Sequence, residues 1–381
     1  MTKAQKRIEE TLHFFDNKDT YLGYRKLLDC VMDTQDMSWY KEAIALTDWK
    51  EKYPEYEEEL IEKSKQLLQK IYAVPVTEFP RDTPVVIAQQ LVKSYGENRF
   101  SLGPVSLEIK KGEVYGLVGE NGNGKTTLLR ILAKELSLTG GGLNYYFQKK
   151  DLDNFDLRTQ LVYIPQRTQK WYGSLQDNLK FVLASYGVAP EEIETRVLMM
   201  IARLGLWNYK HLKWSELSSG YKMRFELART LLRKPELLLL DEPLANLDVV
   251  AQQVILEDLK GICNSINHPI ALILSSQQLY EVEKVSDKVI FLKNGQYKDS
   301  TEEYQSKNCI VEIESPNKRE ELLQAFAVLH LEKLTFNGGV YVATFGQEVT
   351  FDQVLKAIVN QNITIHYIRN ISDSTRRFFV S

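Results

Sequence analysis

The residues from Gly119 to Thr127 read GENGNGKTT, and they constrain the fold of this chain more than any other feature. They match the pattern G-x-x-x-x-G-K-[ST], in which a glycine-rich loop surrounds phosphate groups. Largely apolar runs precede the loop at 114–118 and follow it at 128–132, so a strand should enter it and a helix should leave it. A chance glycine-rich turn would lack that context. The loop therefore predicts an α/β fold that binds a nucleoside triphosphate.

Each residue type in this loop has a chemical reason. Glycine permits backbone conformations that a side chain forbids, so that successive N–H groups point at phosphate oxygens. The helix that starts near Lys125 adds its positive dipole end to the same anion. Lys125 is expected to reach the β- and γ-phosphates, and Thr126 to offer its hydroxyl to Mg²⁺. The predicted nucleotide contacts of the loop are Gly119, Asn121, Gly122, Gly124, Lys125, Thr126 and Thr127.

The composition excludes several classes of protein. The chain has 381 residues, a formal net charge of −3 and a pI near 6.1, which argues against nucleic acid as its main partner. Its cysteines, Cys30, Cys263 and Cys309, lie far apart, so neither a disulfide framework nor a zinc site is expected. The longest apolar runs are too short to span a bilayer. The charged N-terminus lacks a signal-peptide core, so we expect a cytoplasmic protein.

The hydrophobic pattern changes twice along the chain and predicts domains at residues 1–80, 81–305 and 306–381. In the first segment, apolar residues such as Ile8, Leu12 and Phe15 recur at helical spacing, and glycine is almost absent. This segment should be all helical, with an extended, proline-containing linker at its end. In the second, β-rich runs alternate with helical patterns, which is typical of an α/β domain with a mainly parallel sheet.

The last segment has the pattern of an α+β domain. Strand patterns at 310–313 and 363–368 and helical patterns at 317–326 and 351–359 surround a predicted hairpin at 334–345. The hairpin is centred on Asn337-Gly338-Gly339, a strong turn signal. The order β-α-β-β-α-β is that of a split βαβ, ferredoxin-like unit.

A second motif, Leu237 to Pro243, reads LLLLDEP. Four apolar residues bounded by charge predict a strand buried on both faces. Asp241, at the carboxyl end of that strand, is placed to hold the Mg²⁺ that Thr126 also contacts. Glu242 is placed to orient the attacking water, because hydrolysis needs a base beside the γ-phosphate. The plain structural alternative is a core strand that ends in a solvated acidic pair.

The segment Leu217 to Arg224 reads LSSGYKMR and resembles the signature motif of ABC ATPases, usually LSGGQ, with Ser219 and Tyr221 as its departures. The remaining motifs stand in the order of that family. They are Tyr95 for the aromatic residue on which adenine stacks, Gln166 for the Q-loop, and Asn246-Leu247-Asp248 for the D-loop. The resemblance covers about residues 85–300.

This resemblance implies a P-loop NTPase domain of the ABC type, with a helical subdomain between Gln166 and Leu217. In the family, the γ-phosphate on one P-loop lies against the signature motif of a second subunit, so two copies should pair head to tail around two ATP molecules. The second copy would contribute Ser218, Gly220 and Asp248. The implied magnesium ligands are Thr126, Gln166 and Asp241, and the implied catalytic residues are Glu242, Gln277 and Gln166.

One departure from the family concerns catalysis. The family has a histidine after the strand that follows the D-loop, whereas this chain has Gln277 in Ser275-Ser276-Gln277-Gln278-Leu279. A glutamine amide donates a hydrogen bond to phosphate but carries no protonic charge. Asp241, Glu242 and Gln166 favour an active Mg²⁺-dependent ATPase. The alternative is a non-hydrolysing, ATP-gated module that dimerises or regulates a complex.

The chain has one ATPase domain, which fits a transporter subunit that homodimerises beneath separate integral membrane subunits. It would then lie on the inner face of the cell membrane. The C-terminal segment resembles the accessory domain of bacterial exporter ATPases, so export is expected. A soluble ATPase acting on ribosomes or DNA is disfavoured by the acidic charge and the single domain. Trp171, Tyr172 and Trp207 are candidate contacts to the membrane partner, with packing inside the helical subdomain as the alternative.

The N-terminal helical segment departs from the family, and the residues leave four roles open. It could dock on the membrane partner, brace the dimer, lie over the nucleotide, or be a bare structural extension.

Overall fold

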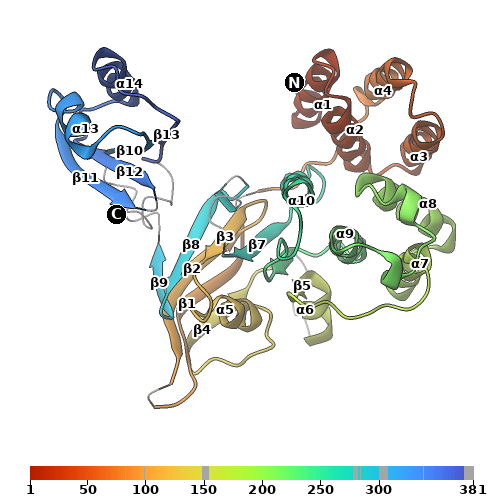
Figure 1. Cartoon of the computed structure of the whole chain (residues 1–381). Helices are drawn as coiled ribbons and strands as arrows, with labels where there is room; N and C mark the ends of the chain where they lie inside the picture. Colours follow the sequence, from red (N-terminus) through yellow and green to blue (C-terminus); the bar gives the residue numbers. More distant parts are fainter. Residues whose placement is uncertain are drawn as a thin grey trace.

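The computed structural model describes residues 1–81, 83–97, 99–147, 154–277, 282–283, 285–299, 308–337 and 339–372. At its centre is a six-stranded sheet in the order β5-β6-β7-β3-β8-β9, in which every neighbouring pair except β8 and β9 is parallel (Figure 1). The strands are β3 (Val114–Val118), β5 (Leu161–Ile164), β6 (Leu237–Leu240), β7 (Ala271–Ser276), β8 (Lys288–Lys293) and β9 (Gln296–Asp299).

Strand β6 shows why these apolar runs form the middle of a sheet. All of its residues are buried, which confirms the predicted strand with two covered faces. Leu237 and Leu239 belong to one hydrophobic core, whereas Leu238 and Leu240 point into the other. The sheet therefore separates two cores, and the side chains that follow its strands emerge together at the carboxyl edge.

The core of Leu238 and Leu240 also contains the helices that follow β5, and the segment between Gln166 and Leu217 is mainly helical. Ser174 caps α7 by accepting a hydrogen bond from the N–H of Asp177, and Pro190 begins α8. Among the described residues, no helix combines the length and the apolarity needed to cross a bilayer. The elements are α6 (Asn154–Gln160), α7 (Leu175–Ser185), α8 (Pro190–Arg203), η1 (Trp207–Tyr209), η2 (Trp214–Glu216), α9 (Ser219–Leu231) and α10 (Val249–Cys263).

A separate antiparallel sheet, in the order β2-β1-β4, packs with α5 (Lys125–Leu132) in the second core. Its strands are β1 (Pro84–Ser94), β2 (Ser101–Lys110) and β4 (Gly140–Tyr145). The sequence prediction of alternating strands and helices did not separate this sheet from the parallel one. The reason is local, because β1 and β2 are joined by a short turn and pair as a hairpin, whereas parallel strands need a long crossover.

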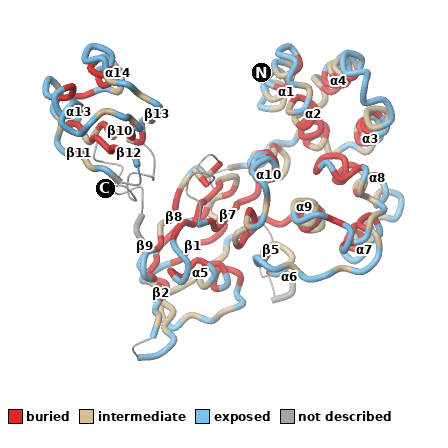
Figure 2. The backbone as a smooth tube through the Cα atoms, viewed as in Figure 1, coloured by how far each residue is buried: buried red, intermediate tan, exposed pale blue. Residues whose placement is uncertain are grey.

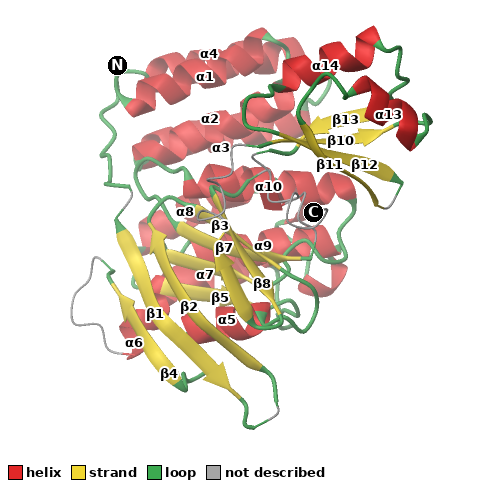
Figure 3. Ribbon diagram, turned by 90° about the vertical axis from the view of Figure 1, so that its left-hand side faces the viewer, coloured by secondary structure: helices red, strands yellow, loops and turns green. Residues whose placement is uncertain are grey.

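The first 71 residues form helices α1 (Lys3–Asp16), α2 (Thr20–Thr34), α3 (Met37–Lys52) and α4 (Glu57–Ile71). Thr2, Asp19 and Asp36 cap the first three of them by accepting hydrogen bonds from backbone N–H groups. The helices form a layer over α8 and α10, as Figures 1 and 3 show from two directions. Their buried faces belong to the same hydrophobic core as the helices of the ATPase segment (Figure 2).

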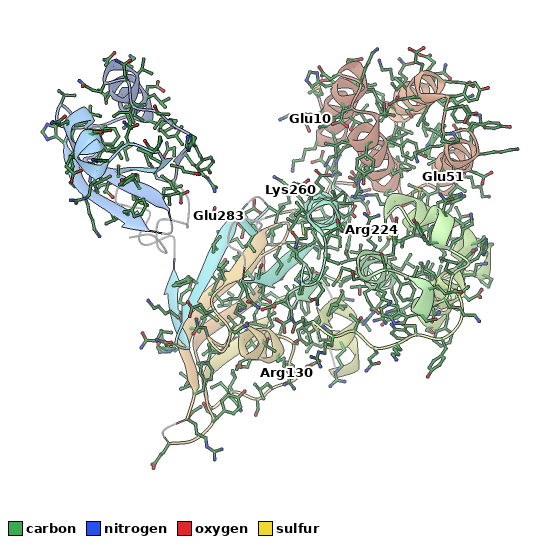
Figure 4. The ribbon with its side chains drawn as sticks, in the orientation of Figure 1. Glu10, Glu51, Arg130, Arg224, Lys260 and Glu283 are labelled. Carbon is green, nitrogen blue, oxygen red and sulfur yellow. The ribbon has the colours of Figure 1, made fainter. Side chains whose placement is uncertain are left out.

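Buried ion pairs cross the seam between this helical layer and the rest of the chain. Arg203, on α8, contacts Asp29 of α2 and also Asp258 of α10, the latter at 2.5 Å. Arg25 of α2 contacts the same Asp258, whereas the pair of Arg7 on α1 with Asp33 on α2 lies within the N-terminal layer. Figure 4 labels Lys260 on α10 and Glu10 on α1, on the two sides of this seam. Two residues of α2, Arg25 and Asp29, therefore connect the N-terminal layer to α10 and to α8.

The C-terminal residues form a four-stranded antiparallel sheet in the order β11-β12-β10-β13 with two helices. In chain order the elements are β10 (Cys309–Glu314), α13 (Arg319–Ala325), β11 (Leu331–Asn337), β12 (Val340–Phe345), α14 (Phe351–Asn360) and β13 (Tyr367–Asn370). Gly338 of the predicted turn lies outside the described residues.

The last strand begins later than the sequence predicts, at Tyr367, which pairs with Glu314. Ile363 and Ile365 still pack against the core of this unit, so their alternation reflects burial without sheet pairing. Arg369 on β13 lies 3.4 Å from Glu283, which connects this unit to the segment before β8.

Candidate functional site

The phosphate-loop candidate has the strand-loop-helix geometry that the sequence predicts, since β3 leads into it and α5 begins at Lys125. Gly124 has a φ of +100°, and a side chain there would also collide with the ring of Phe100. Gly119 has a different constraint, because a Cβ atom would lie 2.4 Å from the carbonyl oxygen of Leu292. Both positions therefore require glycine. Asn121, Gly122 and Thr126 are exposed, and Thr127 is half-buried.

Lys125 is held inside this loop. Its side chain is 5% exposed, and its ammonium donates hydrogen bonds to the carbonyl oxygens of Gly119 at 2.6 Å and Glu120 at 3.3 Å. The same ammonium lies 3.5 Å from the carboxylate of Glu242. A buried cation with these short-range partners is positioned to transfer its contacts to an anion that enters the loop.

Asp241, at the end of β6, is the centre of a buried hydrogen-bond group. Its carboxylate accepts hydrogen bonds from the hydroxyls of Thr126 and Ser275, both at 2.8 Å, and from that of Tyr163 at 3.2 Å. Burial, together with the charge of Asp241, raises the pKa of the Tyr163 hydroxyl, which therefore stays a donor. Sequence reasoning missed Tyr163 and Ser275, although both lie in motifs that were recognised.

Glu242 follows directly and gathers side chains from three distant segments. Its carboxylate accepts a hydrogen bond from the amide of Gln166 at 3.1 Å and two from that of Gln277 at 2.9 and 3.0 Å. With Lys125, the structure thus brings together the three predicted catalytic residues and the loop lysine. The backbone of Glu242 has a φ of +48°, and its N–H donates to the hydroxyl of Ser275 at 2.9 Å. Left-handed backbone at a non-glycine residue is strained, and such strain clusters at functional sites.

Of the three predicted magnesium ligands, two lie in contact with each other and the third contacts a different side chain. Thr126 and Asp241 are in hydrogen-bond contact, whereas Gln166 is turned to Glu242. Within the described residues, there is no group of three or more histidine, cysteine or acidic side chains that could hold a metal. Mg²⁺ is commonly bound by one or two protein oxygens together with waters and substrate phosphates. One carboxylate beside one hydroxyl at the phosphate loop fits that mode.

The signature residues lie on a different surface from the phosphate loop. Ser218 caps α9, and the hydroxyl of Ser219 donates to the carbonyl of Asn246 at 3.1 Å. Asp248 caps α10 by accepting from the N–H of Ala251 at 2.9 Å. Ser218, Gly220 and Asp248 line a cavity of about 470 Å³ whose other walls come from α2, α3, α8, α9, α10 and the Gly205–Tyr209 turn. No residue of the phosphate loop lines it.

Tyr95 is connected to the phosphate loop through one aromatic neighbour. Its ring is 44% exposed and its centre lies 6.5 Å from that of Phe100, the residue against Gly124. Lys93 places its ammonium 5.4 Å from the Tyr95 ring. An exposed ring beside the loop leaves a face open for stacking.

The aromatic candidates for a membrane contact differ in exposure. Tyr172 is 91% exposed, whereas Trp207 is buried in the core, where Lys210 covers its ring at 3.8 Å. Trp171 is half-buried, donates to Glu226 at 2.6 Å, and has the guanidinium of Arg229 over its ring. The alternative prediction, packing inside the helical subdomain, explains the position of Trp207 and most of the contacts of Trp171. Tyr172 stays a candidate, because its side chain is exposed on the surface while its backbone carbonyl accepts a hydrogen bond from Asn178 at 2.8 Å.

Comparison with known proteins gives matches over the same segment. A family model described as ABC transporter matches residues 102–245. A lantibiotic transport ATP-binding protein of Streptococcus pyogenes is 34% identical over 208 residues, which are 54% of this chain and 86% of that protein. An Fe(3+) ions import ATP-binding protein of Fusobacterium nucleatum is 33% identical over 206 residues, and the match spans 54% of each chain.

Solved structures are similar in fold. The structure of cbiO1 from Clostridium perfringens, part of the ABC transporter complex cbiONQ, has a TM-score of 0.52 and 25% identity, and covers 57% of this chain and 87% of that chain. An inward-facing conformation of a putative metal-chelate type ABC transporter has a TM-score of 0.50 and 19% identity, and covers 71% of this chain and all of that chain. The relatives include an import protein, so the likeness carries no direction of transport.

Proposed function

Because this chain belongs to the ABC transporter ATP-binding proteins, we propose that it hydrolyses ATP between two of its own copies and thereby drives export through separate membrane subunits. The observation that carries the proposal is the environment of Glu242. Lys125, Gln166 and Gln277 converge on that carboxylate, directly after the Asp241 that contacts the hydroxyl of Thr126. A carboxylate held beside a phosphate loop suits the activation of water.

In the proposed reaction, Lys125 leaves the carbonyl oxygens of the loop and binds the β- and γ-phosphates, where its charge offsets that of the transferred group. Glu242 orients the attacking water and accepts its proton. The amide of Gln277 fixes the carboxylate in place, and that of Gln166 does so before Mg²⁺ binds, since each donates to it. Bound Mg²⁺ would neutralise charge on the phosphates, with Thr126 and Asp241 as its holders and Gln166 joining once it turns from Glu242.

The assembly is part of the same proposal. Ser218, which is exposed, and the N–H of the half-buried Gly220 stand at the start of α9, and with Asp248 they would face the ATP bound to the second copy, where Ser218 and Gly220 would bind the γ-phosphate. We keep the domain bounds 1–80, 81–305 and 306–381. The last of these would be a ferredoxin-like accessory domain, and the order of its strands and helices supports that class. The membrane subunits would hold the pair at the inner face of the membrane, with Tyr172 as a candidate contact.

Lys125→Ala tests the nucleotide site. Loss of one charge-assisted contact, worth about 1.5–3 kcal/mol, should weaken ATP binding roughly 10- to 150-fold. Fluorescence titration with a labelled ATP analogue, competed by ATP, measures the affinity. Lys134→Ala, at an exposed lysine just after α5, is the matched control and should bind as the parent does. An unchanged ATP affinity in Lys125→Ala would show that the phosphate loop is not part of the nucleotide site.

A second candidate function rests on Gln277, which stands where the family has histidine and whose amide nitrogen donates to both carboxylate oxygens of Glu242. A chain in which that contact blocks the base would bind ATP and dimerise without hydrolysis. Gln277→Ala and Gln277→His separate the two functions.

If Gln277 supports catalysis, Gln277→Ala should lower the steady-state ATPase rate at least tenfold. The reason is the loss of hydrogen bonds to a charged group, each worth about 1.5–3 kcal/mol, against 1.4 kcal/mol per factor of ten in rate. Gln277→His should keep or raise the rate, because an imidazole N–H makes a similar contact. A parent without turnover that Gln277→His activates would favour the second function. Parent-like turnover in Gln277→Ala would make Gln277 a bystander.

A further inference from the structure

The seam between the N-terminal helices and the ATPase segment contains a cavity of about 370 Å³ that has no part in the proposed chemistry. Its walls come from the end of α2, the ends of α7 and α9, the middle of α8 and the end of α10. Pockets for small molecules usually measure about 300–1,000 Å³. The size fits one small ligand, and the position gives such a ligand contact with both sides of the seam.

Much of the wall is apolar and buried. Met199 and Met200 of α8, Leu183 of α7, Leu231 of α9 and Ile270 before β7 all line the cavity and are less than 9% exposed. Methionine side chains adapt to irregular apolar ligands. The wall therefore suits the hydrocarbon part of a ligand.

The two carboxylates in the lining are already neutralised. Asp33 is paired with Arg7 and Asp29 with Arg203. Burial alone would raise the pKa of Asp29, but Arg203 and Arg7 outweigh it and hold that pKa below its usual value, so the pair stays ionic. These four groups leave the cavity without net charge on that side.

Among the described residues, the lining also carries two cations without a carboxylate partner, Arg233, whose guanidinium lies 5.3 Å from the centre of the Tyr186 ring, and Lys234. Within the described part of the chain, neither Arg233 nor Lys234 has a carboxylate within 4 Å; Lys234 donates to the side-chain oxygen of Gln35 at 2.8 Å and Arg233 to the carbonyl of Arg158 at 2.7 Å. The ε-nitrogen of Arg233 is buried and has no hydrogen-bond partner there.

Burial lowers the pKa of the half-buried Arg233 guanidinium. Arg196 also lines the cavity and is paired at 2.8 Å with Glu192, which is not part of the lining. A buried N–H without a partner is costly, and an anion would satisfy it. The lining also contains His268, which contacts the carbonyl of Pro235, and the hydroxyl groups of Tyr40 and Tyr186.

We propose that this seam cavity binds a small amphipathic anion, with its carboxylate or phosphate head at Arg233 and Lys234 and its apolar body against Met199 and Met200. Such a ligand would touch α2 as well as α8 and α9, so its binding holds the N-terminal helices to the ATPase segment. The site is separate from the nucleotide site and does not depend on the proposed transport function.

Thermal unfolding of the full chain with four probes tests this. Octanoate and octyl phosphate have both parts of the ligand, octanol lacks the charge, and inorganic phosphate lacks the apolar body. A ligand that binds only the folded state raises the unfolding midpoint in a saturable way. We expect such a rise with octanoate or octyl phosphate, and the stronger of the two identifies the head group. Equal or larger effects of octanol or inorganic phosphate, or no rise with either amphiphile, would overturn the proposal.

Variants locate the site. Arg233→Gln with Lys234→Gln should weaken the effective amphiphile about tenfold or more, because the charge-assisted contacts to its head are lost. Lys234→Gln alone changes an exposed side chain, which keeps the test valid if the double variant does not fold. The matched control is Lys333→Gln with Lys356→Gln, the same loss of charge on the C-terminal unit, with parent affinity expected. Parent-like affinity in the Lys234→Gln and double variants would place the ligand elsewhere.

Discussion

Glu242→Gln should reduce ATP hydrolysis about 10²- to 10⁴-fold, the range that a general base contributes, while ATP binding changes little. Glutamine has nearly the same size, and its amide oxygen still accepts hydrogen bonds from Gln166 and Gln277, but it takes no proton from water. It also removes a negative charge 3.5 Å from Lys125, which frees that lysine for phosphate. The ATP-bound pair of chains should then accumulate, and size-exclusion chromatography with ATP and Mg²⁺ would detect it.

The matched control is Glu135→Gln, which removes an exposed carboxylate that pairs with Arg130 of α5 at 3.3 Å. This variant should hydrolyse ATP at the parent rate, because surface pairs of this kind contribute little. If the Glu242→Gln chain hydrolyses ATP as fast as the parent, Glu242 is not the general base. Loss of ATP binding in it would instead point to a structural role for the left-handed turn at Glu242.

How far the sequence predicts the site depends on how local each signal is. The sequence predicts two parts of the site correctly, Gly119 to Thr126 and Asp241 to Glu242. Each directly follows an apolar run that is recognisable as a buried strand, so its position at the end of a strand can be predicted from neighbouring residues alone. Gln166 and Gln277 were placed by family resemblance alone. The partners of Asp241 were missed, since a tyrosine on β5 and a serine on β7 become neighbours only when the strands align beside β6.

The N-terminal helices show the same limit at the level of the fold. Spacing of apolar residues predicts helices in residues 1–80, and the structure has helices there up to Ile71. Spacing does not predict the surface on which they pack, because the decisive pairs join residues 174 to 233 positions apart, such as Asp29 with Arg203 and Arg25 with Asp258. The helices pack on α8 and α10, and α2 and α3 line the same cavity as the signature residues Ser218, Gly220 and Asp248, so a place near the nucleotide of a second copy stays a prediction.

Arg203 is the charge on which this packing depends most. Its side chain is 3% exposed and contacts Asp29 from the N-terminal layer and Asp258 from α10. Burial alone would lower the pKa of Arg203, but the two carboxylates outweigh it and raise that pKa, so the group stays charged. Asp258 is fully buried, and it keeps Arg25 as a second partner. Removal of Arg203 would leave Asp29 and Asp258 buried with too little positive charge.

Arg203→Met should therefore lower the free energy of unfolding by about 3–5 kcal/mol, the cost of leaving a buried charge without its partner. Urea unfolding measures this, and limited proteolysis between α4 and β1 reports whether the N-terminal helices separate first. Arg196→Met, on the same helix, is the control, because its i,i+4 pair with Glu192 is partly solvated and worth about 0.3–0.5 kcal/mol. Adding Asp29→Asn to Arg203→Met should recover stability, since it removes one of the uncompensated charges, whereas the same change in the parent should destabilise. Equal losses in Arg203→Met and Arg196→Met would mean that the ion pairs do not hold the N-terminal layer, and that its apolar contacts with α8 alone do so.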